Sequence, residues 1–159
     1  MVSIKNKIEI NIFRKNLYIY NMTDYNIIYK NRILMRHKCI DYSIIAYTYL
    51  KDKKYDFIKS IQVKRHLINE HDPNYDPHHY YIELKCIKND RIFKIIIDNE
   101  DTYNYHFYKS RYIPKNIQKL NHKTIINAYR CINNLQDFKN IVISDIDFKL
   151  QEIKINSFL

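Results

Sequence analysis

The sequence of 159 residues contains no glycine at all, and only two alanines and three prolines. Without glycine, the chain cannot form the glycine-rich phosphate loop, the dinucleotide-binding fingerprint or the glycine-flanked nucleophile elbow. The glycine-bearing signatures of RRM and KH domains are excluded for the same reason. Left-handed backbone positions must therefore fall to other residues, of which Asn and Asp are the least costly.

Cysteine is also scarce, because Cys39, Cys86 and Cys131 are the only three and lie far apart. No Cys-x-x-Cys pair is present, which argues against a zinc ribbon or a disulfide framework. Cys86 and Cys131 fall on predicted apolar faces, where we expect buried free thiols. No apolar run approaches the length of a membrane span. We therefore expect a reducing, intracellular location, such as an organelle matrix or the cytoplasm of a virus-infected cell.

Ile, Asn, Lys and Tyr dominate the composition instead. AT-rich codons specify these four residues, so we infer an AT-rich genome, such as that of an organelle or a virus. The formal net charge of +10 suggests nucleic acid as a partner. Codon bias alone also raises the lysine content, so only part of this charge bears on function. The length and the 46% hydrophobic content fit a single folded domain, 1–159.

The clearest structural pattern is a hairpin within residues 80–98. Two apolar runs flank Asn89-Asp90, a pair that tolerates the positive φ angles of a two-residue turn. The turn sets a register in which one face carries the pairs Cys86–Phe93, Leu84–Ile95 and Ile82–Ile97. The opposite face then carries Glu83, Lys85, Lys94 and Asp98, with Ile87 and Ile96 among them. We expect the first face to lie on the core.

Other segments have weaker patterns. Strands are predicted within 8–13, 17–20, 25–29, 33–35 and 141–150, the last with a bulge near Ser144-Asp145 that restores its alternation. Segments 40–50 and 54–68 fit a strand or a helix. The best helix is 122–138, capped by Asn121, with a core-facing stripe made of Ile125, Ala128, Tyr129, Ile132 and Leu135. The predicted fold class is α+β, a mostly antiparallel sheet of hairpins with helix 122–138 packed on it.

An aromatic and basic run over 103–112 suggests how the chain would hold nucleic acid. Aromatic rings that stack on bases beside cations that contact phosphates bind single strands without reading their sequence. The predicted contact residues are Tyr103, Tyr105, Phe107, Tyr108, Lys109, Arg111 and Lys115. A tyrosine-rich strand packed on the sheet is the alternative interpretation. We therefore predict a non-catalytic RNA- or single-strand-binding component of a ribonucleoprotein, without a cofactor.

A metal-dependent nuclease is the alternative enzyme hypothesis. Glu83 and Lys85 form an E-x-K step on a strand, and the hairpin register brings Asp98 diagonally near Glu83. Two carboxylates can hold Mg²⁺ while a lysine steadies a hydroxide or a phosphate. In residue type this trio resembles the PD-(D/E)xK nuclease pattern. It departs from that pattern in order, because the preceding acid would be Asp76, in a loop. A surface ion pair explains the same residues.

Two further groups of polar residues are candidate metal ligands. A loop carries His71, Asp72, Asp76, His78 and His79, and the predicted last strand carries Asp145 and Asp147. Such side chains can bind a transition metal, but a solvated loop and a polar strand edge explain them equally. A Cys-His or Ser-His-Asp arrangement cannot be derived from spacing, because its members meet only in the fold.

The third functional hypothesis is a viral protein that binds a host protein through its aromatic face.

Overall fold

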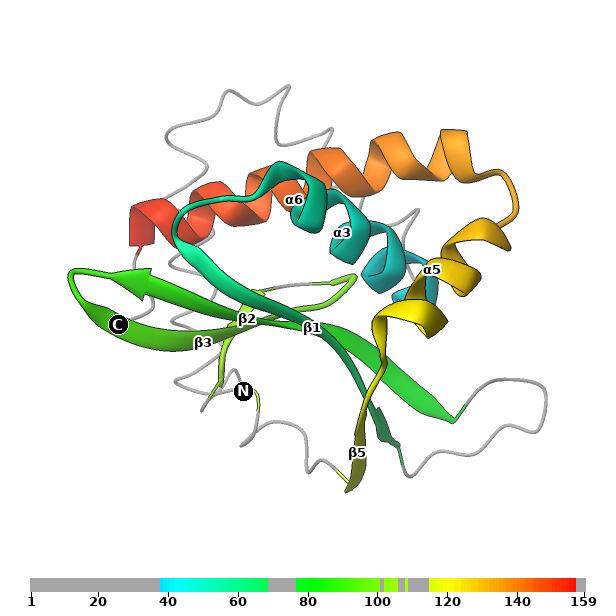
Figure 1. The fold of residues 1–159 in the computed structure, drawn as a ribbon, viewed down its shortest axis with the longest axis horizontal. Coiled ribbons are helices and arrows are strands. Elements are labelled where there is room, and N and C mark those ends of the chain that lie inside the picture. The colour runs from blue at the N-terminus through cyan, green and yellow to red at the C-terminus, as the bar shows by residue number, and fades with distance from the viewer. Residues whose placement is uncertain (1–37, 69–76, 101, 106–107, 109–114, 157–159) are drawn as a thin grey trace, which may run out of the picture.

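The computed structural model describes residues 38–68, 77–100, 102–105, 108 and 115–156 (Figure 1). Their elements are α3 (Cys39–Lys53), β1 (Ile58–Leu67), β2 (His78–Lys88), β3 (Arg91–Ile97), β4 (Thr102–Asn104), β5 (Lys115–Lys119), α5 (His122–Arg130) and α6 (Leu135–Asn156). The strands form one antiparallel sheet in the order β4-β3-β2-β1-β5. The helices lie on one side of it, which confirms the α+β class. The strands predicted before residue 38 lie outside the described residues.

The central hairpin forms as predicted. Strands β2 and β3 pair Ile82 with Ile97 and Cys86 with Phe93, which is the predicted register. The turn residues Asn89 and Asp90 have φ angles of 51° and 63°. These positive values are those of a two-residue hairpin turn, and Asn and Asp adopt them here in place of glycine.

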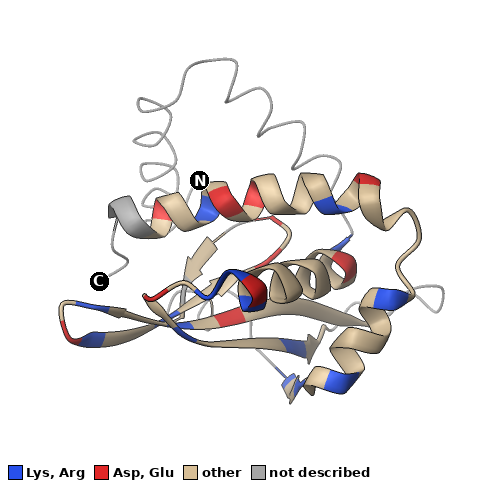
Figure 2. Cartoon of the chain, turned by 45° about the horizontal axis from the view of Figure 1, so that its top comes forward, with Lys and Arg blue, Asp and Glu red and all other residues tan. Residues whose placement is uncertain are grey.

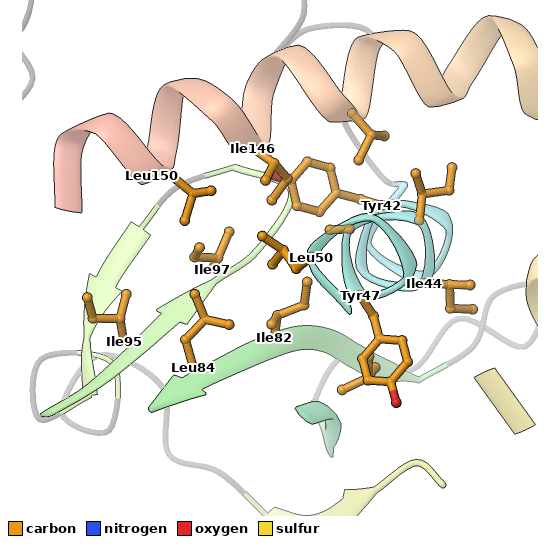
Figure 3. Close-up of a cluster of buried hydrophobic side chains, with 14 of the residues drawn as sticks. Tyr42, Ile44, Tyr47, Leu50, Ile82, Leu84, Ile95, Ile97, Ile146 and Leu150 are labelled. Atoms are coloured by element: carbon orange, nitrogen blue, oxygen red, sulfur yellow. The ribbon is translucent and has the colours of Figure 1, made fainter. Parts of the chain in front are cut away.

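The core lies between the hairpin and the helices (Figure 3). Helix α3 packs on β1 and β2, and its residues 42–47 are all buried. A helix that is buried on nearly every side shows no amphipathic period, so segment 40–50 could not be assigned from its sequence. Ile82 and Leu84 of β2 contribute fully buried side chains from the sheet, and Ile146 and Leu150 reach the same core from α6.

The C-terminal part corrects two predictions. The predicted helix 122–138 is interrupted, because α5 ends at Arg130 and α6 begins at Leu135 after Asn134 takes a φ of 54°. The strand predicted over 141–150 is wrong, since this segment is the middle of α6. The supposed slip in alternation near Ser144 is a helical period: Val142, Ile146, Leu150 and Ile153 recur every three or four residues and are all buried.

The start of α5 agrees with the prediction. The Asn121 side chain accepts a hydrogen bond of 2.8 Å from the Thr124 amide, so it caps the helix. The predicted stripe is also found, with Ile125 buried and its other members packed against the core. Cys86 is buried as expected, whereas Cys131 is exposed because it follows the last turn of α5. Among the described helices, none is long and apolar enough to cross a membrane.

Candidate active site

Three reactive side chains meet at one end of the sheet. Cys39 is the first residue of α3, His79 lies near the start of β2, and Asp98 directly follows β3. Because Ile82 pairs with Ile97, the hairpin places Asp98 and His79 diagonally on the same sheet face. The three residues are far apart in the sequence, and the packing of α3 on β2 brings them together.

Contacts join the three residues in a row, with the histidine in the middle. The Nε2 atom of His79 lies 3.1 Å from Oδ2 of Asp98. The side chain of Cys39 is close enough to this imidazole to raise its pKa. The other carboxylate oxygen, Oδ1 of Asp98, accepts a hydrogen bond of 2.9 Å from the amide of Glu100. We call Cys39, His79 and Asp98 the triad.

Asp98 is the most buried member of the triad. Cys39 is half-buried, and the His79 side chain keeps 19% of its surface exposed, whereas Asp98 keeps only 1%. A buried carboxylate beside a partly exposed imidazole is the arrangement in which an acid orients a catalytic histidine. The imidazole can therefore meet a substrate, and the carboxylate can only orient the ring.

The charge state of His79 follows from its partners. Burial lowers the pKa of His79, but hydrogen bonds to Asp98 and Cys39 and the negative charge of both groups raise it to about 10 overall. The imidazole is thus protonated at neutral pH. Such a cation can stabilise a thiolate and later supply a proton to a leaving group.

A second histidine beside the triad has the opposite behaviour. The rings of His66 and His79 meet edge-on with centroids 5.6 Å apart. Burial, together with the nearby charge of His79 and His78, lowers the pKa of His66 to about 4, against the opposing effect of Asp98. Nδ1 of His66 lies 3.3 Å from the hydroxyl of Tyr108. His66 is therefore neutral at physiological pH and packs against the ring of His79.

The predicted nucleic-acid contacts separate into different environments. Tyr103 and Tyr108 are both only 1% exposed and pack together with Tyr81, so their rings are covered by other side chains. Tyr105 is half-buried, and Nζ of Lys94 lies 4.8 Å from its ring centroid. Lys115 is exposed on β5. The remaining predicted contacts, Phe107, Lys109 and Arg111, lie outside the described residues.

The acidic members of the nuclease trio have basic partners of their own. The Glu83 carboxylate contacts Nζ of Lys64 at 3.1 Å and Nζ of Lys94 at 3.9 Å. Lys85 is exposed, and the Asp98 carboxylate is held by His79. Asp76 lies outside the described residues.

The metal-ligand candidates are also dispersed. His78 and His79 are neighbours on β2, so their side chains point to opposite faces of the sheet. Asp145 pairs with Lys149, and Asp147 accepts a hydrogen bond from Tyr49. In the described part of the chain, no three His, Cys, Asp or Glu side chains are grouped to hold a metal ion. His71 and Asp72 lie outside that part.

The sequence suggests His79 as a metal ligand and Asp98 as a nuclease acid, and it gives no indication that Cys39 is a site residue. The hairpin register contained a usable signal, because it puts Asp98 as close to His79 as to Glu83. The position of Cys39 could not be found in this way, since segment 40–50 fitted a strand as well as a helix. Comparison with known proteins adds nothing to the assignment: no family model, curated protein or solved structure matches this chain.

Proposed function

We propose that the protein is a cysteine-dependent acyl-transfer enzyme. Cys39 is the nucleophile, His79 is the general base and acid, and Asp98 orients the imidazole. The observation that carries this proposal is the 3.1 Å contact between His79 and the buried carboxylate of Asp98, with the Cys39 side chain close enough to raise the pKa of the same imidazole. Unrelated folds carry the same constellation, so its geometry supports the role without a family resemblance. The proposal differs from the non-catalytic role that the sequence alone favours.

The position of Cys39 supports its role as nucleophile. Amide groups in the first turn of a helix point outwards, and the helix dipole favours negative charge there. The residue before it, Lys38, makes no side-chain cap of α3. This helix end and the imidazole of His79 both adjoin Cys39, where they can stabilise negative charge that develops during the reaction. The same amides can stabilise an oxyanion that forms next to the sulfur.

The chemistry follows from these positions. The Cys39 sulfur attacks the carbonyl carbon of an ester or amide, forming a carbon–sulfur bond while the π electrons move to the oxygen. The tetrahedral species collapses, the bond to the alcohol or amine breaks, and His79 gives the leaving group its proton. Water or another nucleophile then attacks the thioester and passes a proton to His79. The carbon–sulfur bond breaks, and the acyl product leaves the regenerated thiolate.

Acylation by p-nitrophenyl acetate tests this proposal. We expect a burst of p-nitrophenolate close to one equivalent per protein, with mass spectrometry placing the acetyl group on Cys39. Cys39→Ser should abolish the burst, whereas the matched variant Cys131→Ser, which changes an exposed thiol, should retain it. A burst that survives in Cys39→Ser, or equal acetylation of Cys39 and Cys131, would overturn the assignment.

We also propose that the protein binds nucleic acid, because one specific observation favours this second function. Residues 102–136 contain no Asp or Glu but six Lys or Arg. Figure 2 colours the Lys and Arg positions of the chain blue, β5 and α5 included. Four of the six cations are exposed on these two elements: Lys115, Lys119, Lys123 and Arg130. We call these four residues the basic surface. Exposed cations are the sequence-independent contact for phosphates.

The start of α5 adds to this surface. Its first turn carries Lys123 and no acidic residue. The positive end of the helix dipole and the side-chain cation therefore act together on an anion. Binding would rest on phosphate contacts, since the rings of Tyr103 and Tyr108 are buried and cannot stack on bases in this conformation.

Filter binding of single-stranded RNA and DNA over a range of salt concentrations tests the basic surface. Changing its four residues to Ser should weaken binding and reduce the salt slope by roughly two to three, at about 0.7 per phosphate contact on a single strand. The matched control changes four exposed lysines, Lys51, Lys53, Lys54 and Lys59, which alternate with Asp52 and Asp56. Equal losses in the two variants, or no salt-dependent binding by the unaltered protein, would contradict the proposal.

A further inference from the structure

A buried cation of α6 connects two parts of the triad. The Lys149 side chain is fully buried, and its Nζ donates a hydrogen bond of 2.7 Å to the backbone carbonyl of Asp98. The same ammonium donates to the hydroxyl of Tyr42 at 2.9 Å. Its counter-ion is Asp145, one helical turn earlier, at 2.6 Å. The Tyr42 hydroxyl in turn donates to Asp145 at 2.7 Å.

These contacts reach the helix that carries Cys39 and the backbone of Asp98. Tyr42 lies three residues after Cys39, so it is the next turn of α3 on the same helix face. Asp98 carries the carboxylate that orients His79. One ammonium group therefore fixes the helix that carries the thiol relative to the strand end that carries the carboxylate. We call Tyr42, Asp145 and Lys149 the tether.

The tether is costly if stability is its only role. A buried ion pair loses the hydration of both charges, and an apolar pair of similar volume often gives a fold of equal stability. Among the described residues, Oδ1 of Asp145 also has no hydrogen-bond partner, although the atom is buried. The three contacts of the ammonium are directional, and two of them reach elements that carry triad residues. These contacts fix the position of α3 relative to the end of β3, which an apolar pair would not do.

We propose that Lys149 is a positioning residue, which holds α3 and the end of β3 in the arrangement that the triad requires. This inference rests on the proposed acyl-transfer function. The cation of α6 touches neither the thiol nor the imidazole, and it acts through the Asp98 carbonyl and the Tyr42 hydroxyl. The C-terminal helix is thus part of the catalytic architecture and not only a cover for the core.

The test measures acetylation of Cys39 by p-nitrophenyl acetate as a function of pH. The double variant Lys149→Met/Asp145→Asn removes both charges together, so that no unpaired charge stays buried. We expect it to keep the circular dichroism of the unaltered protein, to acetylate Cys39 roughly tenfold or more slowly, and to show an altered pH profile, because small displacements of catalytic groups reduce rates up to about 100-fold. The matched control, Lys139→Met/Asp137→Asn on the same helix, should change neither quantity.

A milder variant decides the matter if the double variant does not fold. Tyr42→Phe removes one hydroxyl link and should slow acetylation of Cys39 by about threefold, within the range that a single lost hydrogen bond supplies. A rate and pH profile equal to those of the unaltered protein in Tyr42→Phe, or in a folded double variant, would overturn the positioning role. If the unaltered protein itself forms no acetyl-Cys39, the failure lies in the proposed function, and the inference fails with it.

Discussion

The triad and the basic surface are two contrasting ways in which this chain presents reactive groups. The triad consists of three side chains from distant segments: His79 contacts the buried carboxylate of Asp98, and Cys39 is close enough to raise the pKa of the same imidazole. The basic surface consists of exposed cations that are close in sequence and do not need to touch one another. The first depends on how the fold is assembled, and the second depends mainly on local composition. The two should therefore respond to different changes.

The largest expected effect comes from changing the Asp98 carboxylate, which should slow acetylation of Cys39 and leave RNA binding unchanged. Asp98→Asn keeps the size of the side chain but removes the charge that orients the imidazole of His79. We expect the rate of Cys39 acetylation to fall by about 10²–10⁴, as for a triad that loses its orienting charge. Filter binding of RNA should keep its affinity and salt slope. Loss of both properties in this variant would mean that the two sites are not independent.

His79 of the triad and the neighbouring His66 predict a maximum in stability near pH 6.5. The pKa of His79 is raised from 6.5 to about 10, so its stabilising contribution is complete below about pH 6.5 and is lost as the pH rises through 10. The pKa of His66 is lowered to about 4, so stability is lost as the pH falls from 6.5 towards 4.

Urea unfolding at several pH values measures both effects. The variant His79→Gln should flatten the alkaline side of the stability profile, and His66→Gln should flatten the acidic side. The basic surface contributes no histidine to either side, so its quadruple variant serves as the control. Profiles of unchanged shape in both histidine variants would contradict the assignment.

Variants of the basic surface should do the opposite, weakening RNA binding while leaving acetylation of Cys39 nearly unchanged. Neutralising Lys115, Lys119, Lys123 and Arg130 is expected to weaken RNA binding by about 10- to 100-fold near physiological salt, because several phosphate contacts are lost. Acetylation of Cys39 should stay within about twofold of the unaltered rate, since these residues lie on β5 and α5 and the triad lies on α3, β2 and the end of β3. A large loss of acetylation would indicate that the surface and the triad share one binding event.

The smallest predicted effect concerns the cap of α5. Asn121→Ala removes the side-chain acceptor for the Thr124 amide and should reduce the free energy of unfolding by about 1 kcal/mol. Thermal unfolding measures this change. The effect on Cys39 acetylation should be negligible at temperatures where the protein is folded. A loss of more than about 2 kcal/mol would show that the helix start has a larger structural role than capping.

Local patterns were sufficient for part of the fold. The Asn89-Asp90 turn has its own conformational signature, and two apolar runs beside it fix the strand register, so the hairpin could be derived completely. Segment 141–150 could not, because a few apolar residues with one irregularity fit a bulged strand as well as a helix. Its helical period becomes clear only when residues 135–156 are treated as one element.

The candidate site was less accessible to prediction than the fold. Charge along the sequence already indicates the basic segment that carries Lys115, but it does not reveal that Tyr103 and Tyr108 are buried against the sheet. The contact between Cys39 and His79 depends on the packing of α3 on the hairpin, and no local pattern specifies that packing. Likewise Lys149 reads as an ordinary helix cation until its buried partners are known.

The most direct test of the account is the alkylation of Cys39 by iodoacetamide at about pH 6, where an ordinary thiol is almost entirely protonated. Mass spectrometry compares its rate with that of the exposed Cys131 in the same molecule. If His79 activates the thiol, Cys39 reacts faster than Cys131, and His79→Gln removes the difference. Equal rates for the two cysteines in the unaltered protein, or an advantage of Cys39 that survives in His79→Gln, would contradict the account.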